Sequence, residues 1–208
     1  MKKIKEIFEV FVSKIITYYI ILVYKTSKIN ITGCYDLVHD NNEEKFVVGL
    51  WHGESHCCYP ILKDTDTYMV TTTNRRGAYI SRVGKDFGYI PLRLPDESEG
   101  KNHIFKIRST INGEEKHNLA LALDGPSGPY HQTQKFVLLT TLLAKRRMVL
   151  VKFEIKGKIQ LNNRWDKYIL PLPFCKVNVH FHEPIEIKKV EIDTIGEKIA
   201  DIMEKHYK

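Results

Sequence analysis

The chain has 208 residues, a length that suits a single domain with one sizeable hydrophobic core. An apolar content of 43% and a charged content of 27% exclude an intrinsically disordered composition. The formal net charge of +7 favours anionic partners such as phosphate groups, lipid headgroups or nucleic acid, without choosing among them. The four cysteines form no CxxC pair and no zinc-type spacing, which favours free thiols in a reducing compartment.

Residues 1–30 are predicted to form an amphipathic N-terminal helix. An apolar stripe recurs at steps of three and four residues, and lysines surround it. The stripe consists of Ile4, Phe8, Phe11, Ile15, Tyr18 and Leu22. The densest apolar stretch, residues 15–24, covers about ten residues, whereas a bilayer span needs about 20. A core helix and a transmembrane helix stay open as alternatives, but the aromatic and lysine content favours a helix in the membrane interface. The segment lacks the apolar region and cleavage site of a secretory signal.

From residue 31 to residue 208, short β-rich runs alternate with helical stretches. Strands are expected at Phe46–Leu50, Thr67–Thr73, Tyr89–Leu92, Asn118–Leu123, Met148–Glu154 and Val177–Phe181. Helices are expected at Ala78–Phe87, His103–Asn112, Phe136–Ala144 and Ile192–Tyr207, with a polar loop at Asp96–Asn102. This alternation predicts the α/β class: a single layered domain, residues 31–208, whose mostly parallel or mixed sheet is flanked by helices.

Two polar motifs directly follow predicted strands, at the edge where open α/β sheets place their ligands. In the first, the strand "FVVGL" stops at Trp51, His52 and Gly53, which presents an imidazole at the rim of the sheet. In the second, "LALDGPSGP", Asp124 leaves an apolar strand and enters a stiff loop. The loop residues that give this stiffness are Gly125, Pro126, Gly128 and Pro129. The two motifs therefore predict a polar site at one edge of the sheet.

A third strand ends in "GYIPLR", where Arg93 can bind a phosphate or a carboxylate through two parallel hydrogen bonds. Metal binding is not expected, because the pair His52 and His56 copies the spacing of HExxH but has Gly53 where that motif needs Glu. The chain also contains no P-loop, no GxSxG elbow and no dinucleotide GxGxxG. These absences argue against a nucleotidase, a serine hydrolase and a dehydrogenase.

In order along the chain, "LWHG", "GYIPLR", "ALDGPSGP" and "RWDKYILPLPFCKVNVHFHEPI" resemble the motifs of the lysophospholipid acyltransferase superfamily. The nearest resemblance is to its small bacterial, formerly uncharacterised branch, which carries Trp-His-Gly and Asp-Gly-Pro-x-Gly-Pro motifs. The similar segments run from about Phe46 to Ile185. The resemblance implies a glycerolipid acyltransferase-like fold. It also implies an O-acyltransferase that moves a fatty acyl group from acyl-CoA or acyl carrier protein to a lipid hydroxyl and needs no cofactor.

The resemblance also assigns roles to residues. It makes His52 the general base that takes the proton of the acceptor hydroxyl, with Asp124 as the second catalytic residue. Arg93 would hold an anionic headgroup. The remaining positions expected to bind substrate are Trp51, Gly53, Gly125, Pro126 and Gly128. Loop N–H groups near Gly53 or Gly125 would stabilise the oxyanion.

One departure from the superfamily concerns the orientation of His52. The acidic residue usually found five positions after this histidine falls on Cys57 here, so Glu54 or Asp124 is expected to orient the imidazole instead. The alternative function is a catalytically weakened, lipid-binding member of the same superfamily. A nucleic-acid binder is disfavoured because the Lys and Arg residues are scattered and no binding motif organises them. The expected partners are an acyl thioester donor, a lipid acceptor and an anionic membrane surface, at the cytoplasmic face of the cell membrane.

Overall fold

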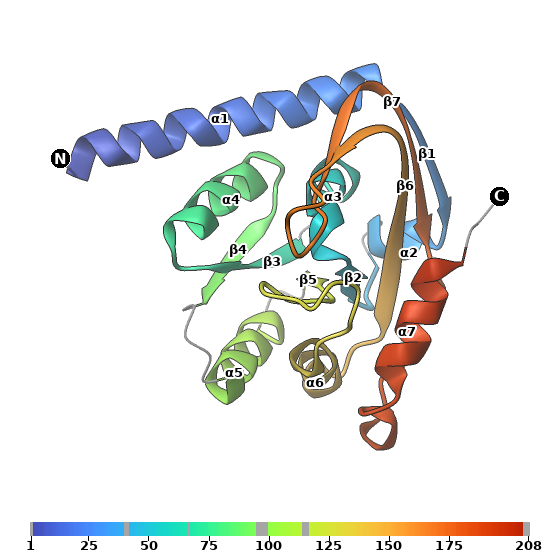
Figure 1. The fold of residues 1–208 in the computed structure, drawn as a ribbon. Coiled ribbons are helices and arrows are strands. Elements are labelled where there is room, and N and C mark those ends of the chain that lie inside the picture. The colour runs from blue at the N-terminus through green and yellow to red at the C-terminus, as the bar shows by residue number, and fades with distance from the viewer. Residues whose placement is uncertain (1, 40–41, 66, 95–99, 114–116, 206–208) are drawn as a thin grey trace.

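The computed structural model describes residues 2–39, 42–65, 67–94, 100–113 and 117–205, and within them it shows a seven-stranded sheet with helices on both faces (Figure 1). The strands are β1 (Lys28–Gly33), β2 (Val47–Leu50), β3 (Thr67–Thr72), β4 (Ile90–Leu94), β5 (Asn118–Ala122), β6 (Met148–Gln160) and β7 (Ile169–Phe181). They lie in the order β1-β7-β6-β2-β5-β3-β4, and all neighbours are parallel except β6 and β7. The predicted α/β class with a mixed sheet is confirmed.

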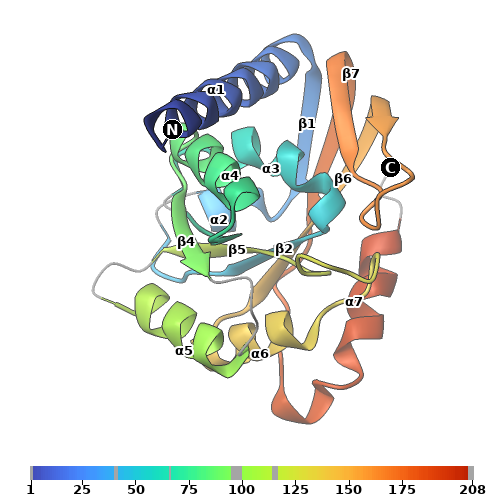
Figure 2. The ribbon, with the colours of Figure 1, turned by 60° about the vertical axis from the view of Figure 1, so that its left-hand side comes forward.

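The helices form two layers around this sheet, as Figures 1 and 2 show from two directions. One layer holds α1 (Lys2–Thr26), α2 (Tyr35–His39), α3 (Ser55–Ile61) and α4 (Arg75–Asp86), and the other holds α5 (Gly100–Ile111), α6 (Lys135–Ala144) and α7 (Ile195–Glu204). The central strand β2 serves both layers, because Val48 packs into the core of the first and Val47 into the core of the second. A strand covered on both faces has no polar alternation, which explains the continuous apolar run that ends at the candidate site.

The β6–β7 hairpin is longer than predicted, since each strand has 13 residues where the sequence indicated seven and five. Pro171 and Pro173 lie in β7 before Lys176, the position level with the start of β1. In that part β7 pairs with β6 alone, and proline is tolerated in a strand that has a free edge. The prolines and the exposed lysines on β6 hid this extension from the sequence pattern.

Smaller differences concern four other segments. Strand β1 and helix α2 were not predicted, and α7 ends at Glu204, before the expected end at Tyr207, which lies outside the described residues. The expected loop 96–102 also lies mostly outside them, and its last three residues open α5.

Helix α1 lies along the domain and packs through one face. Ser13, Thr17, Ile20 and Val23 on this face are at most 7% exposed. The carboxylate of Asp86, at the end of α4, accepts hydrogen bonds from Lys14 Nζ (2.6 Å) and from the Thr17 hydroxyl (2.8 Å). These contacts fix the helix against α4.

The apolar stripe predicted for this helix faces the other way. Its described members, Phe8, Phe11, Ile15, Tyr18 and Leu22, are 51–68% exposed. The segment Glu6–Thr26 is also long and apolar enough to cross a membrane by length and composition. A core helix that buries the stripe in its own domain is therefore excluded, and the stripe is an exposed apolar face of the protein.

Candidate active site

The ends of β2 and β5 bring the two predicted motifs together. The two strands are parallel neighbours with Leu50 opposite Ala122, so the residues that follow each strand meet at the same edge. His52 opens a short 3-10 helix, η1 (His52–Glu54), and its backbone N–H donates to Asp124 Oδ1 at 2.8 Å. Asp124 is fully buried. The carboxylate therefore fixes the backbone of His52, while the imidazole is free to interact elsewhere.

The His52 ring contacts a carboxylate that the sequence analysis did not single out. Asp166, in the loop between β6 and β7, places Oδ2 2.9 Å from His52 Nδ1. The Asp166 side chain is completely buried, whereas the His52 side chain is 31% exposed. A half-open imidazole against a buried carboxylate is the arrangement found where histidine acts as an oriented base.

Arg164 holds this carboxylate in its charged form. Its Nε and Nη2 donate to the two oxygens of Asp166, each at 2.9 Å, in a bidentate pair. Burial alone would raise the pKa of Asp166, but the hydrogen bonds from Arg164 and His52 outweigh burial and lower the pKa below its usual value. An ionised carboxylate can only accept, so His52 donates from Nδ1 and keeps the lone pair on Nε2. In this tautomer Nε2 is the ring nitrogen that can accept a hydrogen bond.

Gly53 lets the hairpin loop approach His52 this closely. A Cβ at position 53 would lie 2.2 Å from the backbone carbonyl oxygen of Asp166, a distance that no side chain allows. This glycine, which was predicted to bind substrate, leaves room for the backbone that carries the carboxylate.

The loop after β5 meets the same hairpin through Gly128. This glycine has a φ of +79°, and a Cβ there would lie 2.5 Å from the Trp165 ring. The Trp165 ring centroid is in turn 5.3 Å from that of His52. The Asp-Gly-Pro loop therefore supports the hairpin loop beside the imidazole.

His56, one turn further along, contacts the same hairpin through a different group. Its Nδ1 is hydrogen-bonded to the hydroxyl of Tyr168. Burial lowers the pKa of His56 to about 4, with smaller contributions from the charges of His52 and Arg164, so the ring is neutral at physiological pH. His56 is thus an uncharged, weakly basic ring that packs against the hairpin loop.

An apolar crevice begins at His56 and runs beneath α1. It encloses about 410 Å³, its open mouth included. Side chains from α1, α3, β1 and β7 line it, among them Tyr19, Cys57 and Pro171. The Tyr19 hydroxyl donates to the Pro171 carbonyl at 2.7 Å, which ties α1 to the hairpin along this wall. The lining is almost entirely apolar.

The expectation that Glu54 orients the histidine is wrong. The residue is buried, with one carboxyl oxygen lacking a partner, and it accepts from the backbone of Phe153 on β6 instead of from His52. Burial raises the pKa of Glu54 to about 8. Asp124, the other candidate, bonds to the backbone N–H of His52 and not to its ring. Burial raises the pKa of Asp124, and the hydrogen bond from the His52 backbone opposes this rise only in part.

Most of the residues near the loop after β5 that were expected to bind substrate make contacts within the protein. Trp51 is 3% exposed, and its ring stacks on that of His131 with the ring centroids 4.5 Å apart, so Trp51 packs against the loop after β5. Gly125, with a φ of +65°, donates its N–H to the Ala122 carbonyl, and this group is therefore not available for an oxyanion. Pro126 is exposed at the loop surface. Nothing in this placement supports direct substrate contact by Trp51.

Arg93 lies away from the imidazole. Strand β4 is separated from β2 by β3 and β5, which corresponds to about 14 Å at the usual strand spacing. The Arg93 guanidinium donates to the backbone carbonyls of Thr72, Thr73 and Asn74, where β3 ends, and the shortest of these bonds is 2.9 Å. The structure therefore joins His52 and Asp124 but does not bring Arg93 into contact with them.

Across the described ranges, no three His, Cys, Asp or Glu side chains converge in a manner suited to a metal ion. The residues that the sequence analysis missed are Arg164, Asp166 and Tyr168. The available signal was the segment "RWDKY", in which Arg and Asp two residues apart lie between two strands. That segment belongs to the motif quoted for the resemblance, but its spacing from His52 along the chain gave no reason to pair the two.

The comparisons with known proteins agree with this architecture. No protein-family model and no curated protein matches the chain. Among solved structures, a similar fold is found in the crystal structure of the 1-acyl-sn-glycerophosphate (LPA) acyltransferase PlsC from Thermotoga maritima. The match has a TM-score of 0.50 and 13% sequence identity, and it covers 95% of this chain and 82% of that chain. The chain is therefore similar in fold to an acyltransferase.

Proposed function

We propose that the protein is a membrane-peripheral O-acyltransferase that transfers a fatty acyl group from a thioester donor to the hydroxyl of a lysolipid or a related lipid. The observation that carries this proposal is the His52 imidazole, open on one side and held at Nδ1 by the buried, Arg164-bound carboxylate of Asp166. The fold likeness to an acyltransferase supports the same reaction class.

In the proposed reaction, His52 Nε2 takes the proton of the acceptor hydroxyl as that oxygen attacks the thioester carbonyl carbon. The new C–O bond forms, the tetrahedral intermediate collapses, and the C–S bond breaks. The imidazolium returns its proton to the departing thiolate, so the products are the ester and the free thiol. Asp166 stabilises the transient imidazolium and keeps the ring in the tautomer that accepts at Nε2. No acyl-enzyme is formed.

The apolar crevice beneath α1 is proposed to take the acyl chain. Its lining is almost entirely apolar, and His56 on its wall is four residues from the proposed base. The neutral state of His56 suits this role, because a charged ring in an apolar lining would carry a desolvation cost.

The proposed location is the cytoplasmic face of the cell membrane. The exposed apolar stripe of α1 supports attachment at a lipid surface, while the bonds from Lys14 and Thr17 to Asp86 hold the helix on the domain and argue against a span. All four cysteines are free thiols, as expected in a reducing compartment.

For the acceptor, 1-acyl-glycerophosphate is the first compound to try, because the structural neighbour is named for it. Acyl-CoA and acyl carrier protein remain the two proposed donors. The weakened, lipid-binding alternative rested on Cys57 in the place of the usual acid. Asp166 supplies a carboxylate to His52, so that alternative loses the observation that favoured it.

The test incubates the purified protein with a long-chain acyl thioester and a panel of lysolipids, and it follows free thiol release together with the acylated lipid by mass spectrometry. We expect release that depends on an acceptor, and its loss in His52→Ala. His39→Ala is the matched control, since His39 is an exposed histidine that precedes β2 at the opposite edge of the sheet. Thiol release that persists in His52→Ala would remove His52 from its role, and liposome binding without turnover on every acceptor would favour the weakened member.

A further inference from the structure

Phe174 is an exposed aromatic residue held in an unusual backbone conformation. Its side chain is 81% exposed, and its φ is +64°, in the left-handed region that side chains other than glycine rarely adopt. Such a conformation is energetically unfavourable and persists only where the surroundings enforce it. Two hydrogen bonds to the end of α1 hold this backbone in place. Phe174 N–H donates to the Thr26 hydroxyl at 3.2 Å, and Cys175 N–H donates to the Ser27 hydroxyl at 3.1 Å.

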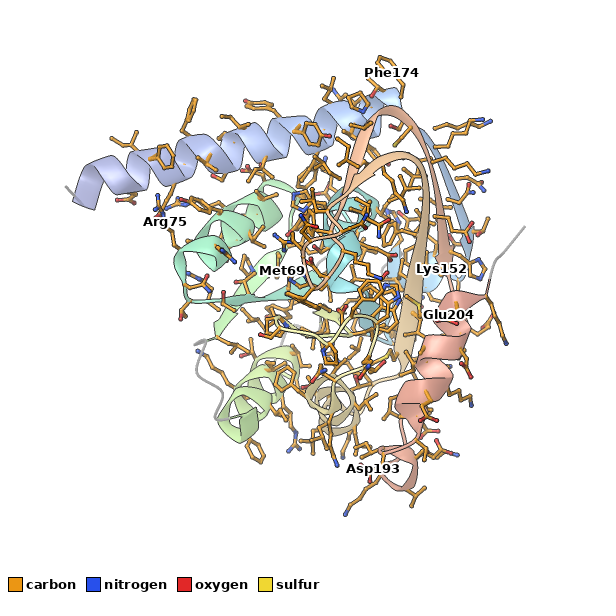
Figure 3. The ribbon with its side chains drawn as sticks, in the orientation of Figure 1. Met69, Arg75, Lys152, Phe174, Asp193 and Glu204 are labelled. Carbon is orange, nitrogen blue, oxygen red and sulfur yellow. The ribbon has the colours of Figure 1, made fainter. Side chains whose placement is uncertain are left out.

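These bonds attach Phe174 to the end of α1. Thr26 is the last residue of the helix whose exposed face carries the apolar stripe. Figure 3 shows Phe174 beside the C-terminal turns of α1, with its side chain pointing away from the domain. The hairpin therefore extends the exposed apolar surface of α1 beyond the end of the helix.

Three lysines form a row across the sheet next to this aromatic ring. Lys28 on β1 is level with Lys176 on β7, and Lys176 is level with Lys156 on β6. All three are exposed. Like charges directly opposite one another destabilise a sheet, so the row favours an anionic partner. Glu154, two residues before Lys156 on β6, has its carboxylate 3.6 Å from Nζ of Lys152, which is not one of these three lysines.

We propose that Phe174 and the lysine row form a second membrane-attachment site, which binds anionic lipid headgroups while the apolar face of α1 lies in the interface. The proposal deepens the membrane location proposed above and rests on it. The ring enters the headgroup region, as aromatic side chains do at membrane interfaces, and the lysines contact the anionic surface. Two attachment sites, one along α1 and one at the hairpin, fix the orientation of the domain on the membrane.

A lipid bilayer fits this surface better than a protein partner. The apolar side chains lie along one helix and one hairpin corner, and the neighbouring polar side chains are lysines, which are depleted at the cores of protein interfaces. An anionic bilayer needs no complementary shape and is attracted by the same positive charges.

The test measures co-sedimentation of the full chain with vesicles of phosphatidylcholine alone or of phosphatidylcholine mixed with phosphatidylglycerol. The triple variant Lys28→Gln, Lys156→Gln, Lys176→Gln should lose about a hundredfold in affinity for the anionic vesicles at low salt, since each lysine near such a surface contributes about fivefold. Added salt should shrink this difference. Phe174→Asn should lose about tenfold on both kinds of vesicle, and asparagine tolerates the left-handed conformation of this position.

Matched controls separate this site from general effects of charge and hydrophobicity. Lys188→Gln, Lys189→Gln, Lys198→Gln removes the same number of exposed lysines near α7, and Phe105→Asn removes an aromatic side chain that is 57% exposed on α5, in the opposite layer. Both controls should retain the affinity of the unaltered protein. Equal losses in test and control variants, or no preference for anionic vesicles, would overturn the proposal.

The outcome is independent of the acyltransferase reaction. With a short-chain donor and a short-chain acceptor dissolved below their aggregation concentrations, the Phe174 and lysine variants should turn over like the unaltered protein. Absence of turnover in every variant, together with the expected vesicle pattern, would refute the proposed reaction and leave the attachment site standing. Turnover with no vesicle effect would refute the attachment site alone.

Discussion

Two histidines, four residues apart, meet the same hairpin loop in different ways. His52 contacts the buried carboxylate of Asp166, and His56 contacts the hydroxyl of Tyr168. A carboxylate stabilises a protonated imidazole, whereas a neutral hydroxyl gives no such charge pairing, and burial lowers the pKa of His56 to about 4. The loop therefore gives one ring the surroundings of a base and keeps the other neutral in an apolar lining. Burial together with the type of partner therefore distinguishes the two rings.

The largest expected effect comes from removing the charge that distinguishes the two rings. Asp166→Asn should lower kcat by about 10³- to 10⁴-fold with little change in KM, because the amide can donate to Nδ1 and move the ring proton to Nε2. Nitrogen-15 NMR of histidine-labelled protein reports the tautomer directly, with His52→Gln identifying the signal. Asp193→Asn, at an exposed carboxylate paired with Lys135, is the control and should leave both readouts unchanged.

A smaller loss is expected from the residue that holds the carboxylate. Arg164→Gln should reduce kcat by about tenfold to a hundredfold, the range typical of residues that hold a functional side chain in position without contacting substrate. Arg164→Lys should recover only part of this, since a lysine cannot make the bidentate pair. Full activity in Arg164→Gln, measured by thiol release, would show that Asp166 needs no second partner.

Gly53→Ala tests the close approach of the hairpin loop, which brings the Asp166 carboxylate to His52 and not to His56. The added methyl would meet the Asp166 carbonyl oxygen, so the hairpin loop must move away, at a cost of about 1–3 kcal/mol in the free energy of unfolding. Activity should fall as well. Gly196→Ala is the matched control, because its new methyl meets only ordinary contacts at 3.7 Å or more, and helical alanine is favourable. Urea denaturation measures both, and equal stability of the two variants would contradict the expected clash.

The smallest effect concerns the neutral ring. The pKa of His56 is about 4 in the folded protein and about 6.5 in an unfolded chain, so between these values the unfolded chain binds the proton and the folded protein does not. The free energy of unfolding should therefore fall as the pH drops from about 7 to about 4, by at most about 1.4 kcal/mol per pH unit from this ring. Burial similarly lowers the pKa of His131 and His182 to about 4.

His56→Gln should accordingly make the pH dependence shallower without abolishing it. Urea denaturation at several values between pH 7.5 and pH 4.5 checks this, with His39→Gln as the control at an exposed histidine. An unchanged slope in His56→Gln would mean that the folded protein can protonate this ring as easily as the unfolded chain.

The sequence predicted the parts of this arrangement that depend on local pattern. Strand runs that are buried on both faces marked β2 and β5, and the carboxyl-edge rule brought His52 and Asp124 together before the strand order was known. It could not predict the partner of the ring. Asp166 reaches His52 across 114 positions of the chain, through a hairpin whose prolines and lysines obscured its length. The packing of Gly53 against Asp166 and of Trp51 against His131 could not be predicted for a related reason, since each contact is with a segment that is distant in the sequence.

The pairing of β1 with β7 has a consequence for how the protein is made. The first strand of the sheet joins the last one, so a growing polypeptide releases its N-terminal helix long before its final strand leaves the ribosome. His52 is likewise synthesised well ahead of the loop that carries Asp166. The arrangement around His52 is therefore complete only with the C-terminal third of the chain, and a truncated product would lack the carboxylate that contacts this ring.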